Sequence, residues 1–298
     1  MAARKPPSGP PPSAGVLARY AQAYARELGV AEGRVRAWVA YMIMAGVLAR
    51  HERAGSPRFI VKGGVALELR LRDRARATKD IDLVLRDPRA DLANSLEEAL
   101  TGEPYQGFSF RRKGQPLLLD NGAVNMEVAV TYRGQPWTSI SVDIARAEAG
   151  EADVEWVDAI ALTDVFGVTG PAQLPCLPLR YHVAQKLHGM TLPPRPGKQN
   201  ERFRDLVDLL LMDAMLTQDE DALRQACELV FSTRNTHRWP PDLIAAPHTG
   251  HGPSPNSPRN WNCRTRTSRR HSPVFAASWR ASSARPRRRL SAPSIRPA

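Results

Sequence analysis

Two aspartates separated by one residue, Asp80 and Asp82, are the first candidates for chemistry in this sequence. On a strand, residues two apart leave the same face, so both carboxylates would lie together while Ile81 and Leu83 enter a core. Two carboxylates this close repel each other unless a cation lies between them, and Mg²⁺ prefers oxygen ligands. The pair therefore predicts a metal site, although such pairs also occur as ordinary surface charges at strand ends.

Asp143 is a third acid with the same pattern. It stands in the stretch 138–145, where polar residues alternate with isoleucine and valine, so it shares a polar face while its neighbours bury. If this strand lies beside the strand of Asp80 and Asp82, three carboxylates converge. Three acids can hold two metal ions roughly 3.5–4 Å apart for phosphoryl transfer. The alternative is an exposed aspartate on an antiparallel sheet.

Gly63 and Gly64 stand between an expected strand at 58–61 and the start of a helix at 65–71. Glycine lets backbone N–H groups approach a ligand closely, and a helix N-terminus attracts phosphate oxygens. The glycine pair therefore predicts a phosphate-binding turn, with a plain tight turn as the alternative.

Two motifs together resemble the AbiEii-type abortive-infection toxins, which belong to the DNA polymerase beta-like nucleotidyltransferase superfamily. The resemblance extends in element order from about residue 15 to about residue 235 and does not include the tail. The motifs are Lys62-Gly63-Gly64-Val65-Ala66-Leu67 with Arg70, and Arg76-Ala77-Thr78-Lys79-Asp80-Ile81-Asp82-Leu83.

The resemblance implies a role for each matching residue. Asp80 and Asp82 would hold Mg²⁺ (or Mn²⁺), and Asp143 would be the third acid of the metal site and help to position the attacking oxygen. The nucleotide would be bound by Lys62, Gly63, Gly64, Val65 and Arg76.

A downstream lysine and acids also match the family. Lys186, in an expected helix at 178–190, would contact the nucleotide phosphates. Asp205, with Asp208 as a second candidate, would act near the site as a base or by orienting Lys186. The alternatives are a solvated helix lysine and surface acids that balance nearby arginines.

Val65 is a departure from the wider superfamily, which usually has Gly-Ser at the turn. Valine has no hydroxyl to bond a phosphate, so only backbone groups remain at this position for triphosphate binding.

Hydrophobic periodicity predicts several further elements. Helices are expected at 14–29, 33–52, 92–100, 201–216 and 219–234, with strands at 81–85, 124–130 and 138–145. The expected fold class is α+β: a nucleotidyltransferase core with a short mixed β-sheet, flanked by N-terminal and C-terminal helices and followed by a disordered C-terminal tail.

Composition, periodicity and the resemblance together predict four regions. They are a disordered N-terminus at 1–13, a nucleotidyltransferase core with N-terminal helices at 14–145, a mainly helical part completing the site at 146–235, and a basic low-complexity tail at 236–298.

The net charge of +12 is unevenly distributed. From Arg234 onward there are 13 arginines, no lysine and one acid, so the tail carries the whole excess and the remainder is neutral. A global electrostatic argument for nucleic-acid binding by the folded part therefore fails. The tail reads either as an arginine-rich RNA-binding arm or as the product of an out-of-frame stretch.

Several classes of protein are disfavoured by composition. No apolar run approaches the ~18 residues of a membrane span, and the N-terminus lacks the apolar stretch of a secretory signal, so a cytoplasmic location and no membrane partner are expected. The three cysteines are scattered and form neither a metal motif nor a disulfide framework.

The predicted function is transfer of NMP from an NTP to an acceptor hydroxyl by Mg²⁺-dependent two-metal chemistry. By resemblance the protein would be a toxin paired with a cognate antitoxin, with RNA such as a tRNA 3′ end as acceptor. The alternatives are a small-molecule nucleotidyltransferase of the antibiotic-modifying kind and an inactive relative that only binds nucleotide or a partner protein.

Overall fold

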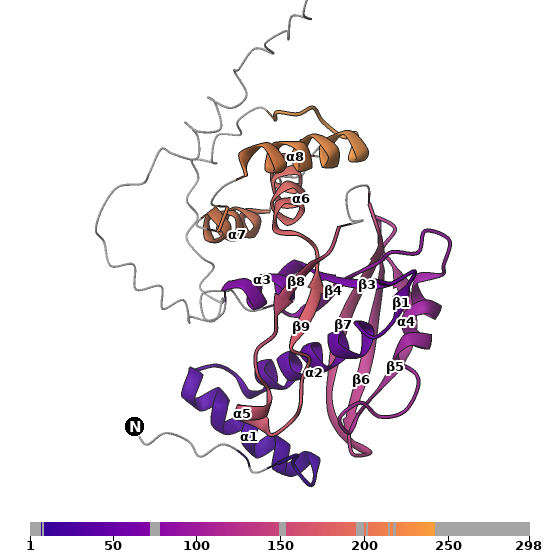
Figure 1. Ribbon diagram of the computed structural model, residues 1–298, viewed down its shortest axis with the longest axis vertical. Coiled ribbons are helices and arrows are strands. Elements are labelled where there is room, and N and C mark those ends of the chain that lie inside the picture. The colour runs from indigo at the N-terminus through magenta and orange to yellow at the C-terminus, as the bar shows by residue number, and fades with distance from the viewer. Residues whose placement is uncertain are drawn as a thin grey trace, which may run out of the picture. The chain divides into compact units, whose positions relative to one another are not determined.

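A mixed β-sheet organises the chain (Figure 1). The computed structural model describes residues 7, 9–71, 78–148, 153–194, 200, 202–213, 215–216 and 219–241. Among these, seven strands form one sheet. In spatial order they are β5 (Phe108–Leu118), β6 (Val124–Tyr132), β7 (Gln135–Arg146), β4 (Asp80–Leu85), β3 (Phe59–Lys62), β9 (Gln173–Cys176) and β8 (Glu155–Asp158).

The sheet is mixed because β4 runs parallel to β7 and β3 runs parallel to β9, whereas the other neighbouring pairs are antiparallel. A separate two-stranded hairpin is formed by β1 (Glu52–Arg53) and β2 (Ser56–Pro57). The strands expected at 124–130 and 138–145 are present and form the antiparallel hairpin β6–β7. Its turn residues Arg133 and Gly134 both have positive φ, of 49° and 74°, as a tight two-residue hairpin requires.

Helices precede, interrupt and follow the strands. They are α1 (Ala14–Leu28), α2 (Glu32–Leu48), α3 (Gly63–Leu71), α4 (Leu92–Leu100), α5 (Thr163–Phe166), α6 (Leu179–Thr191), α7 (Phe203–Asp213) and α8 (Glu220–Arg234). The predicted α+β class with a mixed sheet is therefore confirmed. In the part of the chain that the structure describes, no helix is both long and apolar enough to cross a membrane.

The sequence pattern did not reveal three of the seven strands in this sheet, β5, β8 and β9, nor the two short strands β1 and β2. β5 has a polar run at its centre, and β8 and β9 have four residues each. β8 and β9 come from the part expected to be mainly helical, yet they pair at the edge of the same sheet as β3.

One face of the sheet forms the hydrophobic core. Ile81 on β4 and Val142 on β7 are fully buried and pack in the same core as residues of α1 and α2. Each such side chain contributes about 1.5–3 kcal/mol by leaving water. Because side chains alternate along a strand, this burial sends Asp82 and Asp143 to the opposite face.

The N-terminus is more ordered than its composition suggested. Pro11 is buried, and its carbonyl oxygen accepts a hydrogen bond of 2.7 Å from the Tyr132 hydroxyl. Residues 9–13 of the predicted disordered stretch are therefore placed by the β-sheet domain, while residues 1–6 and 8 lie outside the described residues.

The chain also continues past the expected start of the tail. His237 packs against His188 of α6, with ring centroids 4.7 Å apart, and Trp239 packs against Phe231 of α8 at 4.9 Å. The ordered part thus extends beyond residue 235, and residues 242–298 lie outside the described residues.

Arg70 connects the start of α6 to α3 and β8. Its side chain is 3% exposed, and it donates to the Leu177 carbonyl oxygen at 2.8 Å and to Glu155 at 3.3 Å. Glu155 in turn accepts the backbone N–H of Leu179 at 2.8 Å, in the first turn of α6. These contacts explain why the first motif has an arginine at position 70.

We expect Arg70→Ala to lower the free energy of unfolding by about 3 kcal/mol, because it leaves a buried carbonyl and a carboxylate without their charged donor. Urea denaturation measures this loss. The matched control is Arg224→Ala, which removes an exposed arginine that pairs with Asp221 and Glu228 of the same helix and should leave the midpoint unchanged. Equal midpoints for both variants would contradict the structural role of Arg70.

Candidate active site

Four polar residues stand side by side on four adjacent strands. Asp82 on β4 is in register with Lys62 on β3 and with Asp143 on β7, and Asp143 is in register with Asn125 on β6. Residues in register share a face, with Cα atoms about 5 Å apart. Asp80, two residues before Asp82, lies on the same face. The structure therefore brings together the three acids that the sequence analysis singled out.

The charged form of Asp82, at the centre of this row, is repelled by the carboxylates of Asp80 and Asp143. The pKa of Asp82 is raised to about 6, chiefly by burial and also by the neighbouring charges of Asp80 and Asp143. The Lys62 ammonium and the backbone N–H of Gly64, which donates to Asp82, oppose this increase. The row is thus an anionic site whose charge is only partly compensated by the protein.

The donor set fits a hard divalent ion. Within the described ranges, no group of three or more His, Cys, Asp or Glu side chains is arranged to hold a metal ion by itself. Mg²⁺, however, is usually bound by one or two carboxylates together with substrate phosphates rather than by an all-protein cage. Asp80, Asp82 and Asp143 therefore suit an ion whose coordination is completed by a bound nucleotide.

Both glycines are required by the site. Gly63 has φ +62°, and a Cβ there would come within 1.8 Å of Oδ2 of Asp82. A Cβ on Gly64 would come within 2.4 Å of Oγ1 of Thr78. Since the first-turn N–H groups of a helix have no intrahelical partner, the start of α3 presents donors directly beside the acids. The turn is therefore more than a connection between two elements.

Thr78 and Glu68 support Asp80; Thr78 stands in the second motif without an expected role, and Glu68 was not singled out from the sequence. The Thr78 hydroxyl lies 3.0 Å from both the backbone oxygen and Oδ1 of Asp80. The backbone N–H of Thr78 donates to the Glu68 carboxylate at 3.2 Å, and Arg34 donates to the same carboxylate at 3.4 Å. The available signal was Glu68 itself, a lone acid inside an apolar stretch of α3.

Lys186 is held between two acids. Its Nζ donates to Oδ1 of Asp205 at 2.9 Å and to Oδ2 of Asp208 at 2.8 Å. The lysine side chain is 11% exposed and Asp208 is fully buried, so the alternative of a solvated helix lysine is wrong. Arg202 also donates to Asp205, at 3.2 Å. Asp208 therefore belongs with Asp205 as a partner of Lys186.

The remaining predicted residues have different surroundings. The Val65 side chain is fully buried in the core, so only its backbone N–H could face a phosphate. Lys62 is half-buried beside Asp82. Arg76 lies outside the described residues.

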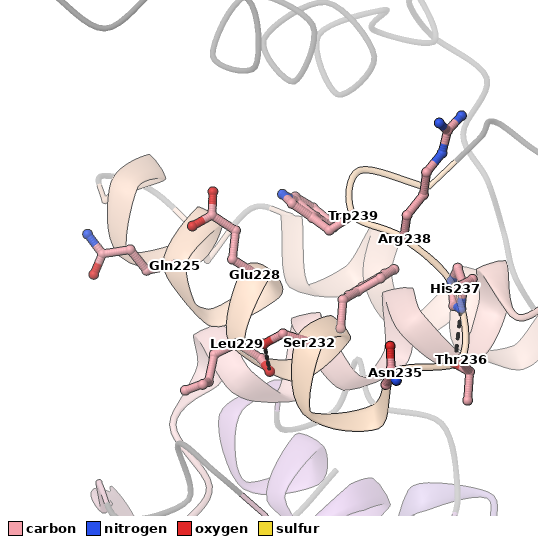
Figure 2. A pocket seen from close by; sticks show the side chains of 10 residues that line it. Gln225, Glu228, Leu229, Ser232, Asn235, Thr236, His237, Arg238 and Trp239 are labelled. Atoms are coloured by element: carbon pink, nitrogen blue, oxygen red, sulfur yellow. Dashed lines mark hydrogen bonds between the residues drawn. The ribbon is translucent and has the colours of Figure 1, made fainter.

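A groove elsewhere on the chain does not contain any of these residues. It lies between α8 and the segment that follows it, and Figure 2 shows Glu228, Ser232 and Trp239 among the side chains that line it. The groove has no cluster of acids, so the carboxylate row remains the candidate active site.

Comparison with protein families identifies one match. The family model described as nucleotidyl transferase AbiEii toxin, type IV toxin–antitoxin system, matches residues 47–290. This range starts later and ends later than the resemblance expected from the motifs. No curated protein sequence matches the chain.

Solved structures provide an independent comparison of the fold. MenT4, a nucleotidyltransferase toxin from Mycobacterium tuberculosis, is 22% identical with a TM-score of 0.53, over 78% of this chain and 75% of MenT4. A nucleotidyltransferase-like protein from Paracoccidioides brasiliensis is 15% identical (TM-score 0.34, 59% and 80% covered). The antibiotic-resistance factor ANT(2″)-Ia is 18% identical (TM-score 0.32, 59% and 83% covered). Only the similarity to MenT4 is strong enough to bear on the fold.

We expect Gly63→Ala to abolish metal and nucleotide binding, because the new methyl group would displace the Asp82 carboxylate. Binding can be measured by calorimetry with Mn²⁺ and an NTP. Gly29→Ala is the matched control: Gly29 has a similar φ of +66° but no atom within 4 Å of the added Cβ. If Gly63→Ala binds Mn²⁺ and the NTP as tightly as Gly29→Ala does, the close approach of Gly63 to Asp82 is unimportant for binding.

Asp82 should make the metal-free protein less stable as pH rises. Its folded-state pKa of about 6 lies above the ordinary value of ~3.9, so the stabilisation of the protonated form is complete below about pH 4 and is lost by about pH 6 to 7. Asp82→Asn in EDTA should therefore be more stable than wild type at pH 7.5, on the order of 2–3 kcal/mol, and not at pH 4. Thermal unfolding at both pH values tests this, and a difference that is independent of pH would contradict it.

Proposed function

Because the chain belongs to the AbiEii family of nucleotidyltransferase toxins, we propose that it transfers a nucleoside monophosphate from an NTP to a hydroxyl group of RNA. The protein is a nucleotidyltransferase of a toxin–antitoxin system, and the identity of its acceptor and the steps below are the proposal. One observation carries it: Asp80, Asp82 and Asp143 share a face of the sheet directly beside the first turn of α3.

The nucleotide phosphates are proposed to bind at the start of α3. The N–H groups of Gly63 and Val65 and the positive end of the helix dipole favour phosphate oxygens at this position. Lys62, in register with Asp82, adds a positive charge directly before the first turn of α3. Backbone donors thus replace the hydroxyl that the wider superfamily has at this turn.

The acids are proposed to organise the reacting groups. Asp80 and Asp82, with Asp143 as the third acid of the site, would hold divalent ions, Mg²⁺ or Mn²⁺, which neutralise phosphate charge and activate the attacking oxygen when bound. Asp143 would orient the acceptor hydroxyl and take its proton. The acceptor oxygen then forms a bond to the α-phosphorus while the bond to the bridging oxygen breaks and pyrophosphate leaves.

Lys186 is proposed to contact the leaving phosphates. An ammonium group has three donors, and two of them are used by Asp205 and Asp208. These acids fix the direction of the third donor. A fixed cation near the departing pyrophosphate would stabilise the charge that develops there.

The acceptor is proposed to approach over the polar face of the sheet beyond Asp143. In this direction Ser141, Glu127 and Lys113 follow Asp80 in register across β7, β6 and β5. Glu127 and Lys113 are exposed. A polar acceptor such as a tRNA 3′ end suits this surface better than an apolar molecule, and both NTP and tRNA are available in the cytoplasm, where we propose that the toxin and its antitoxin act.

We expect label from one of the four α-labelled NTPs to appear on total tRNA in the presence of Mg²⁺. An Asp80→Ala/Asp82→Ala double variant should give no label, because the ion-binding carboxylates are absent. Gel electrophoresis of the recovered RNA measures the transfer. The control is Lys113→Ala, which preserves the acids and should retain transfer with at most weaker RNA binding.

Failure to label RNA by a folded wild-type protein would contradict the proposed acceptor. Label on an added aminoglycoside in the same assay would then identify the small-molecule alternative. Absence of label on every acceptor would favour an inactive relative.

A further inference from the structure

We propose that Asn125 on β6 is a positioning residue that fixes the carboxylate of Asp143, an assignment that rests on the proposed nucleotidyl transfer. Neither the family motifs nor the expected roles include Asn125. It is the residue that ends the row Lys62, Asp82, Asp143 and Asn125 across the sheet.

The side-chain amide of Asn125 has both donors engaged. Its Nδ2 lies 2.5 Å from Oδ1 of Asp143 and 2.7 Å from Oγ of Ser141. An amide nitrogen carries two hydrogens, so one N–H goes to each acceptor. The reverse orientation would place the amide oxygen against the carboxylate, where two acceptors repel. The amide therefore has one favourable orientation.

This contact determines what Asp143 can do. A hydrogen bond to Oδ1 fixes the rotation of the carboxylate and leaves Oδ2 without this donor. Because Asn125 is neutral, it holds the carboxylate without cancelling the negative charge that a divalent ion or an attacking hydroxyl requires. A lysine at this position would neutralise the acid, as Lys62 partly does for Asp82.

Ser141 anchors the arrangement from β7. It accepts the second N–H of Asn125 and is in register with Asp80. The two acids Asp80 and Asp143 thus flank a serine that holds the amide in place. The amide is fixed by two partners on the neighbouring strand rather than by one.

Sheet packing alone does not explain an asparagine here. The neighbouring Met126 and Val128 are buried in the core, whereas Asn125 is half-buried on the polar face. Asparagine is depleted in strands, and a threonine or valine would fit the pleated surface at lower cost. The contact with Asp143 supplies the reason for an amide at this position.

The test measures Mn²⁺ binding to the full chain in the presence of a non-hydrolysable NTP by electron paramagnetic resonance, with thermal unfolding of each variant. Asn125→Leu keeps the size of the side chain but removes both donors, and Asn125→Ala removes the side chain. We expect both to weaken Mn²⁺ binding by about 10- to 100-fold, as loss of a partner that orients a metal ligand usually does. Ser141→Ala, which loses only the anchor, should have a smaller effect.

Ser139→Ala is the matched control. Ser139 lies on the same strand and face, two residues from Ser141, and contacts Lys113 at 3.3 Å instead of Asn125. It should bind Mn²⁺ as wild type does. If Asn125→Leu folds and binds Mn²⁺ as tightly as wild type, or if wild type does not bind Mn²⁺, the proposal is wrong.

RNA labelling with the same variants separates the two proposals. Weakened Mn²⁺ binding in Asn125→Leu, together with no labelling by wild type, would support Asn125 as a positioning residue and reject RNA nucleotidylation. Labelling by wild type with unchanged Mn²⁺ binding in Asn125→Leu would support the reaction and reject the role of Asn125.

Discussion

Repulsion between carboxylates on neighbouring strands is the constraint around which this fold is arranged. The parallel register of β4 and β7 sets Asp82 directly beside Asp143, with Asp80 on the same face. Each of the three acids has a neutral donor, from Thr78 to Asp80, from the Gly64 N–H to Asp82 and from Asn125 to Asp143. Neutral donors orient the oxygens while leaving the negative charge to attract cations. The folded protein tolerates this charge because the opposite face of the same strands is a large apolar core.

Other elements hold donors and a cation in fixed positions. Gly63 permits α3 to start so close to Asp82 that a methyl group would not fit, and the helix N-terminus therefore lies at the anionic row. Arg70 and Glu155 then join α3 to the first turn of α6. α6 carries Lys186, whose two acid partners come from α7. Backbone donors at one helix and an ammonium at another are thus held in place, the ammonium by the fully buried Asp208 and by Asp205.

The sequence predicted the parts of the site that depend on local spacing. The alternation around Asp143 and the Asp80–Asp82 pair identified two strands and the face of each acid, and the glycine pair identified the turn. Contacts that depend on strand register could not be predicted: only the observed pairing of β6 with β7 shows that Asn125 lies opposite Asp143. The strands β8 and β9 were missed because four residues carry too little periodicity, and β5 was missed because the polar run at its centre interrupts the alternation of a half-buried strand. The order of residues 9–13 likewise depends on distant partners such as Tyr132.

Anomalous scattering from crystals grown with Mn²⁺ and a non-hydrolysable NTP would test the central claim most directly. The account predicts Mn²⁺ peaks between Asp80, Asp82 and Asp143, roughly 3.5–4 Å apart if two ions bind, with phosphate oxygens at the first turn of α3. A well-ordered nucleotide bound elsewhere on the chain, with no manganese at the carboxylate row, would contradict it.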